Sequence, residues 1–317
     1  MSGKLVVTLP DLRLAVTAAG EGPAVVCCHG FPDLAYGWRH VLPALAAAGF
    51  HALASDQRGY GETGGPDAVE AYDIHHLTGD LVGLLDALGI ERAVFMGHDW
   101  GGTVAWMTAL LHPSRVAGVI GVNTPHYPRP STAPIARLRA MFGDTHYMVA
   151  AQRPGELDRV MASDVRRTFT QIVRGGVPPD AALSGWLGSD GRMRTLADVV
   201  VGPAMPGAPL LSASELSLYV DAFTRTGFTG GLNWYRNLDR NWATTPQLAG
   251  ARITVPALMV TAEWDVLLPP AAAERMRPLV PDLETVMLPC CGHWTPIERP
   301  TELADLVVAW LRRRIAR

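Results

Sequence analysis

The first 125 residues alternate short apolar runs with amphipathic helical patterns, and this alternation restricts the possible folds of the chain more than any other feature. The runs at 24–28, 93–96 and 116–122 do not alternate polar with apolar residues. Such runs are typical of strands covered on both faces, as in a parallel sheet. Between them, one expected helix begins after Asp73 and carries its leucines along one face, at Leu77, Leu81, Leu84, Leu85 and Leu88. This part of the chain predicts an α/β fold with right-handed crossovers and helices on both faces of the sheet.

The pattern changes between about Tyr127 and Trp242, where the sequence is helical or irregular and rich in proline and glycine. In this stretch 197–201 is ambiguous between strand and helix, and 202–209 resembles a loop. Strand-like runs return at 255–260 and 284–288, and a last helix carries apolar residues along one stripe, from Leu303 to Leu311. We therefore expect a core domain, residues 1–126 and 246–317, interrupted by a helical cap domain, residues 127–245.

Composition excludes several classes of function. Hydrophobic residues make up 48% of the 317 residues, which is ordinary for a globular protein with a sizeable core. The net charge of −3 gives no basis for binding nucleic acid or an anionic membrane. No window approaches the ~20 apolar residues that a membrane span requires, and the first residues do not resemble a signal peptide. We expect a soluble, cytoplasmic protein that is a monomer or a homodimer.

Two vicinal cysteine pairs, Cys27-Cys28 and Cys290-Cys291, follow apolar runs. Neighbouring cysteines rarely bridge each other, and these pairs lack the two-residue spacer that is usual in zinc sites. We expect buried, reduced thiols in both pairs. We expect neither a metal ion nor a cofactor.

The segment Gly97-His98-Asp99-Trp100-Gly101-Gly102 follows a strand-like run and precedes a helical run. This is the context of a nucleophile elbow, a sharp turn that needs small residues two positions before and two positions after the nucleophile. Gly97 and Gly101 meet that need, and the nucleophile position holds Asp99. Taken alone, the segment could also be a glycine-rich turn in which Asp99 caps the helix.

Three further segments favour catalysis over that interpretation. The loop His29-Gly30-Phe31-Pro32 follows a strand, and in a hydrolase of this kind the backbone N–H groups of Phe31 and Trp100 would form the oxyanion hole. Asp265 and His293 each follow the end of a later strand. The chain order is therefore nucleophile, acid and base, and all three lie at the carboxyl edge of the sheet, as the α/β-hydrolase fold requires.

At this point the sequence resembles the epoxide hydrolases of the α/β-hydrolase fold, over nearly the whole chain. The motifs that carry the resemblance are residues 29–32, 56–61, 97–102, 292–294 and, most distinctively, the cap segment Gly231-Leu232-Asn233-Trp234-Tyr235-Arg236-Asn237. This segment is similar to that of the soluble mammalian enzymes and their bacterial relatives, although the chain lacks the extra amino-terminal domain of the mammalian enzymes.

The resemblance implies that the Tyr235 hydroxyl hydrogen-bonds to the epoxide oxygen. It implies a second tyrosine seven residues before the proline of a Gln-x-Pro-Gly sequence, and Tyr147 fits that spacing to Pro154. The residue before the glutamine is Ala151, where the family often has an aromatic residue, so Tyr127 stays an alternative.

The expected reaction converts an epoxide to a vicinal diol through an ester on Asp99. A carboxylate attacks carbon without prior activation, and tyrosine hydroxyls stabilise the departing oxygen. His293, oriented by Asp265, then activates water against the ester. Phe31, Trp100, Tyr147 and Tyr235 are the expected substrate contacts, and an epoxide and water are the expected partners.

Two other functions stay open. A haloalkane or haloacid dehalogenase would share the fold and the nucleophile. Many dehalogenases have asparagine where this chain has Phe31, and haloacid-cleaving relatives often have arginine where it has Trp100. A non-catalytic ligand receptor on the same scaffold is the third interpretation.

Overall fold

An eight-stranded sheet lies at the centre of the computed structural model, which describes residues 2–188 and 193–315. The strand order is β1-β2-β4-β3-β5-β6-β7-β8; β1 and β2, and β2 and β4, pair antiparallel, and the other neighbours pair parallel. The mostly parallel sheet confirms the predicted fold class. The strands are β1 Ser2–Thr8, β2 Arg13–Ala19, β3 Ala24–Cys28, β4 His51–Ser55, β5 Ala93–His98, β6 Val116–Val122, β7 Ala257–Ala262 and β8 Leu283–Leu288.

The predicted strands are present, with small shifts in their ends. β3 and β5 are buried along their whole length, as unbroken apolar runs in a parallel sheet should be. β7 begins two residues later than the expected 255, after Pro256. The sequence patterns indicated neither β2 nor β4; β2 carries polar and half-exposed side chains because it lies near the edge of the sheet.

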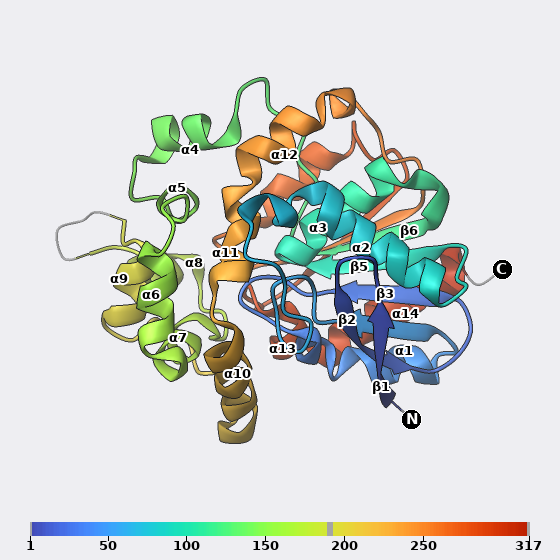
Figure 1. The fold of residues 1–317 in the computed structure, drawn as a ribbon, viewed down its shortest axis with the longest axis horizontal. Coiled ribbons are helices and arrows are strands. Elements are labelled where there is room, and N and C mark those ends of the chain that lie inside the picture. The colour runs from blue at the N-terminus through green and yellow to red at the C-terminus, as the bar shows by residue number, and fades with distance from the viewer. Residues whose placement is uncertain (1, 189–192, 316–317) are drawn as a thin grey trace.

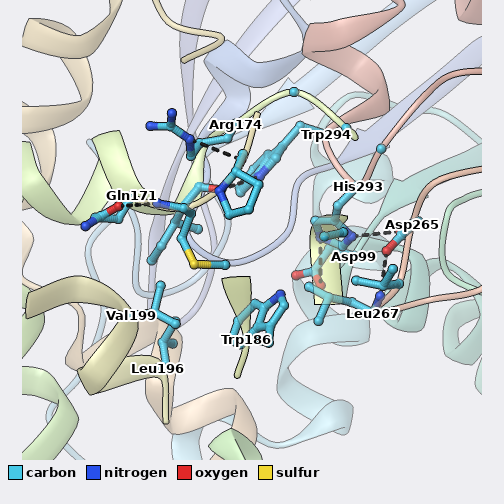
Figure 2. A pocket seen from close by; sticks show the side chains of 18 of the residues that line it. Asp99, Gln171, Arg174, Trp186, Leu196, Val199, Asp265, Leu267, His293 and Trp294 are labelled. Carbon is cyan, nitrogen blue, oxygen red and sulfur yellow. Dashed lines mark hydrogen bonds and ion pairs between the residues drawn. The ribbon is translucent and has the colours of Figure 1, made fainter. Parts of the chain in front are cut away.

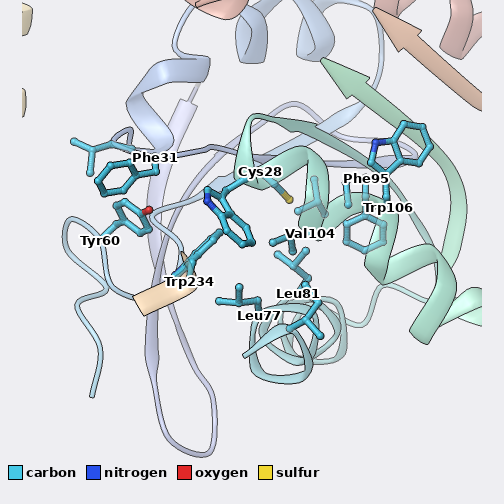
Figure 3. Packing of buried hydrophobic residues seen from close by; sticks show 14 of the residues in the cluster. Cys28, Phe31, Tyr60, Leu77, Leu81, Phe95, Val104, Trp106 and Trp234 are labelled. Atoms are coloured by element: carbon cyan, nitrogen blue, oxygen red, sulfur yellow. The ribbon is translucent and has the colours of Figure 1, made fainter. Parts of the chain in front are cut away.

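Helices cover both faces of the sheet. α1 (Val41–Ala47) and α14 (Pro300–Arg314) pack on one face, and α2 (Ile74–Ala87) and α3 (Trp100–Leu111) pack on the other. Asp73 caps α2 as predicted, since its carboxylate accepts a hydrogen bond from the His76 backbone N–H at 3.1 Å. Figure 3 shows the apolar layer beneath the sheet, where side chains of α2 and α3 meet those of the strands, among them Leu77, Leu81, Val104, Phe95 and Cys28.

Between β6 and β7 the described residues form helices and loops and add no strand to the sheet. Residues 197–201, ambiguous in sequence, belong to a helix, and residues 202–208 form neither helix nor strand. In Figure 1 α5 to α9 lie away from the sheet, with α11 between them and the core. The helices are α4 Pro134–Phe142, α5 Tyr147–Ala150, α6 Glu156–Ser163, α7 Val165–Ile172, α8 Pro179–Gly185, α9 Leu196–Val201, α10 Ala213–Thr226, α11 Thr229–Arg236 and α12 Leu238–Thr244; α13 (Thr295–Glu298) precedes α14.

The helix α11 is attached directly to the core. The Trp234 indole N–H donates to the Arg58 carbonyl at 3.1 Å. Gly230 lies so close to Gly59 that a Cβ atom on Gly230 would be 2.6 Å from the Gly59 Cα, so no side chain fits there. Together these contacts fix the position of Tyr235, which directly follows Trp234 in α11.

The exposure of Cys290 contradicts the prediction that both cysteine pairs are buried. Cys27, Cys28 and Cys291 are buried and free, as expected, but Cys290 is exposed and free. It lies beyond the end of β8, in a turn with a φ of 50°, and its N–H donates to the Glu263 carboxylate.

None of the helices in the described part of the chain has the length and apolar character needed to cross a bilayer.

Candidate active site

Asp99 occupies a strained turn between β5 and α3. Its φ of 52° and ψ of −125° are rare for a residue with a side chain. A Cβ atom on Gly97 would lie 2.0 Å from the Gly101 carbonyl oxygen, and one on Gly101 would lie 2.0 Å from that of Cys28. Asp99 makes no side-chain hydrogen bond that caps α3, which contradicts the capping interpretation. The turn therefore leaves the Asp99 carboxylate available to the site and does not use it to cap the start of α3.

The Asp99 carboxylate lies against backbone donors of the loop after β3. The Phe31 N–H donates to its Oδ1 at 2.8 Å, and the Trp100 N–H also stabilises the charge. Gly30 permits this approach, because a Cβ atom there would be 2.4 Å from Oδ1. Burial raises the pKa of Asp99, while His293 and the two N–H groups oppose that rise; the net pKa lies above the usual 3.8. Phe31 and Trp100 thus lie where the sequence predicted them.

His293 lies between two carboxylates (Figure 2). Its Nδ1 is 2.9 Å from Asp265 Oδ2, and its Nε2 is 3.7 Å from Asp99 Oδ2. Burial disfavours the imidazolium, but Asp265 and then Asp99 outweigh burial and raise the pKa of His293 to about 9. The structure thus brings together the three side chains that the sequence placed after three separate strands.

Asp265 is held by groups that the sequence analysis did not name. Its Oδ1 accepts the N–H groups of Leu267 and Leu268, both at 3.0 Å. Its Oδ2 accepts the Asn123 Nδ2–H at 2.8 Å in addition to His293. Burial raises the pKa of Asp265, yet His293 and these hydrogen bonds outweigh it and leave the pKa below the usual value. Asn123 could have been suspected, because it directly follows β6 at the same edge of the sheet.

His98, inside the elbow motif, is a second residue that sequence reasoning missed. Its Nε2 lies 2.7 Å from the His293 carbonyl oxygen. A carbonyl only accepts, so the His98 Nε2 carries the proton. Burial, followed by the nearby His293, lowers the pKa of His98 to about 3, so the ring is neutral near pH 7. His98 therefore holds the loop that carries His293.

Tyr147 and Tyr235 line the same cavity as Asp99, with ring centroids 5.8 Å apart. Burial, and then the charge of Asp99, raises the pKa of both phenols far above the usual 10, so both keep their protons near pH 7. The Tyr235 ring lies edge-on to those of Trp100 and Phe31, at centroid distances of 5.1 and 5.4 Å. Tyr127 is 47% exposed and is not among the residues that line this cavity, which favours Tyr147 as the second tyrosine.

The cavity has a volume of about 150 Å³, enough for a small organic molecule. Two further polar side chains of its wall are engaged with backbone: Gln171 donates to the Gly202 carbonyl at 3.0 Å, and Arg174 donates to that of Gly207 at 2.9 Å. The remaining wall is largely apolar (Figure 2), with side chains that include Trp186, Leu196, Val199, Met205, Leu267 and Trp294. No pattern in the sequence indicated this wall, because helices and loops that are distant in the chain form it together.

An aspartate elbow, a paired acid and base, and backbone donors at the carboxyl edge of a parallel sheet together define an α/β-hydrolase. Residues 23–175 match the family described as alpha/beta hydrolase fold. Within that class the chain belongs to the epoxide hydrolases, as the resemblance predicted. It is 45% identical to epoxide hydrolase A of Mycobacterium tuberculosis, over 95% of this chain and 94% of that protein.

Two further relatives support the assignment to the epoxide hydrolases. The crystal structure of epoxide hydrolase A from Mycobacterium thermoresistibile superposes with a TM-score of 0.89 at 43% identity, and 98% of each chain is covered. Bifunctional epoxide hydrolase 2 of Sus scrofa is 39% identical over 98% of this chain. The chain spans 55% of the length of that mammalian relative.

Proposed function

We propose that this chain hydrolyses an epoxide to a vicinal diol, with Asp99 as nucleophile and His293 as base. The observation that carries the proposal is the placement of the Asp99 carboxylate. One oxygen accepts the Phe31 N–H, the other faces His293, and two tyrosines, Tyr147 and Tyr235, line the same cavity. This arrangement supplies a nucleophile, an oxyanion site and proton donors for a departing oxygen.

In the first half-reaction, Asp99 Oδ2 forms a bond to one ring carbon and the bond from that carbon to the epoxide oxygen breaks. An ionised carboxylate needs no base for this step. The ring oxygen would leave as a strongly basic alkoxide, so donors aimed at it lower the barrier. Tyr147 and Tyr235 are the proposed donors, because burial keeps both phenols protonated.

In the second half-reaction, His293 must take a proton from water, although its pKa of about 9 makes it protonated near pH 7 in the free enzyme. Formation of the ester removes the negative charge of Asp99, which is one of the two charges that raise this pKa. His293 can then release its proton to solvent and act as a base. It takes a proton from water as the water oxygen bonds to the ester carbon, and Oδ1 takes up negative charge beside the Phe31 and Trp100 N–H groups. The bond from that carbon to the substrate oxygen then breaks, the oxygen takes the proton from His293, and the diol leaves.

We further propose that residues 127–245 act as a cap domain on a core of residues 1–126 and 246–317. Both tyrosines lie in this part of the chain, and so do most residues of the apolar wall. Asp99, Asp265 and His293 lie in the proposed core, whereas both tyrosines and most of the wall lie in the insertion, and this division supports these boundaries. The cytoplasmic location and the monomeric or homodimeric state stay predictions from the sequence.

The test uses His293→Gln, which removes the base but leaves Asp99 able to attack. With a small aryl or alkyl epoxide, the ester should accumulate and add the whole mass of the substrate in intact-protein mass spectrometry, because the ring oxygen stays attached. A haloalkane would add its mass less hydrogen halide. We expect the epoxide adduct on the peptide that contains Asp99 and no adduct from bromo- or chloroalkanes of similar size.

Two controls make the result specific. His75→Gln changes an exposed histidine of α2 and should accumulate no ester. Combining Asp99→Ala with His293→Gln should abolish the ester while leaving any alkylation of the exposed Cys290. Haloalkane adducts without epoxide adducts would show a dehalogenase, and the lack of any Asp99 adduct or turnover would support the receptor interpretation.

A further inference from the structure

We propose that Glu298 is a positioning residue that links the loop of residues 174–177 to the loop that carries His293, and thereby keeps His293 in place for hydrolysis of the ester. The proposal rests on the proposed function of His293 as base. Glu298 does not line the cavity and has no place in the mechanism above.

The Glu298 carboxylate bonds to two separate segments. Its Oε1 accepts the N–H of Gly176, from the insertion between β6 and β7, at 3.0 Å. Its Oε2 accepts the N–H of Gly292, the residue before His293, at 3.0 Å. Glu298 is the last residue of α13, the short helix that follows the histidine loop. One carboxylate thus satisfies a backbone donor on each side of the boundary between insertion and core.

The two loops touch at their glycines. A Cβ atom on Gly176 would lie 2.4 Å from the Gly292 nitrogen, and one on Gly292 would lie 2.5 Å from the Gly176 Cα. Neither position can therefore carry a side chain without moving the loops apart. A second bond crosses the same boundary, since the Trp294 indole N–H donates to the carbonyl of Ile172 at 2.8 Å.

Other groups hold the histidine loop through its carbonyls. His98 donates to the His293 carbonyl at 2.7 Å, and Asn123 and Thr295 donate to that of Gly292 at 3.2 and 3.3 Å. All of these groups belong to the core. Glu298 differs from them in two respects, because it accepts the N–H of the loop and also bonds to the insertion.

This contact connects the cavity to the base. Gly175, Gly176 and Val177 line the cavity, so the loop that faces the substrate is the loop bonded to Glu298. A small displacement of His293 should slow the attack of water on the ester, because proton transfer depends steeply on position. It should leave the attack of Asp99 on the epoxide unaffected, because that step uses no base. Loss of the contact should therefore slow one half-reaction selectively.

The test compares Glu298→Gln with the wild type in single-turnover experiments that measure ester formation and ester hydrolysis separately. The amide offers one acceptor oxygen for two N–H donors and directs its NH₂ at the other donor. We expect ester hydrolysis to slow by about ten- to a hundredfold, ester formation to stay within about twofold, and the ester to accumulate in intact-protein mass spectra. The matched control is Glu302→Gln, which changes an exposed carboxylate in the first turn of α14 that pairs with Arg299 and should change neither rate.

A second variant tests the contact from the other side. Gly176→Ala should give the same selective defect, and the double variant should add little to the larger single effect if both act through one contact. Equal slowing of both half-reactions, or an unchanged ratio of the two rates in either folded variant, would overturn the proposal. If His293→Gln forms no Asp99 ester at all, the proposed function fails, and this proposal fails with it.

Discussion

Replacing Asp99 with asparagine should lower the pKa of His293, because the mutation removes one of the two carboxylates beside its ring. The variant imitates the charge of the ester, in which the Asp99 side chain is neutral. It therefore tests whether the first half-reaction itself converts His293 from an acid to a base.

The size of the change follows from the geometry. His293 Nε2 and Asp99 Oδ2 are 3.7 Å apart. Two unit charges at that distance interact by about 1 kcal/mol in water and by about 4 kcal/mol at an effective dielectric constant of about 20. Since a pKa difference of 1 corresponds to about 1.4 kcal/mol, the pKa of His293 should fall from about 9 by about 1 to 3.

The assay is a titration of the histidine ring protons by NMR spectroscopy. The chain has ten histidines, so the spectrum of His293→Gln is needed to identify the signal. Intact mass checks that the asparagine has not hydrolysed to aspartate, and Asp86→Asn, which changes an exposed carboxylate, serves as control. A His293 pKa in Asp99→Asn within about 0.3 of the wild-type value would refute the charge argument.

Three further predictions concern the first half-reaction. Asp99→Ala should abolish turnover with an unchanged circular dichroism spectrum, and retention of more than about a tenth of wild-type activity would exclude Asp99 as the nucleophile. Tyr235→Phe should slow ring opening by about ten- to a thousandfold in stopped-flow experiments, and adding Tyr147→Phe should slow it much further; an unchanged rate in Tyr147→Phe alone would remove the role from Tyr147. Ester formation requires ionised Asp99, so its rate should rise with pH through a pKa above 3.8; a rate that falls off only below that pH would contradict the effect of burial.

The triad was predictable because each member follows the carboxyl end of a strand, β5 and β7 being buried and β8 largely apolar in sequence but half-exposed. Parallel strands end at one edge of a sheet, so Asp99, Asp265 and His293 had to approach one another once the strands were recognised. The glycines of the elbow were predictable for a related reason, since the turn leaves no space for a Cβ atom. The sheet order and the two antiparallel neighbours of β2 were not predictable, because pairing depends on contacts between distant segments.

Apart from the position of Asn123 directly after β6, nothing in the sequence pointed to the supporting residues. Asn123, His98 and Glu298 each act through one or two hydrogen bonds to another side chain or to the backbone, and such bonds leave no periodic pattern. The apolar wall around Trp186 depends on how α7 to α9 pack in space. Cys290 was wrongly expected to be buried, because its position beyond the end of β8 depends on where that strand ends.

Because α11 is attached to the core, the core holds one of the two proposed proton donors in place more directly than the other. Tyr235 follows Trp234, whose indole is bonded to the Arg58 carbonyl, and its ring lies against those of Phe31 and Trp100. Tyr147 begins the four-residue helix α5, which lies between α4 and α6 and across α11 from the core in Figure 1. Evolution or a designer could thus change α5 to α9 for a new substrate and lose only Tyr147 as a donor. Tyr235 would be kept, because α11 is attached to the core.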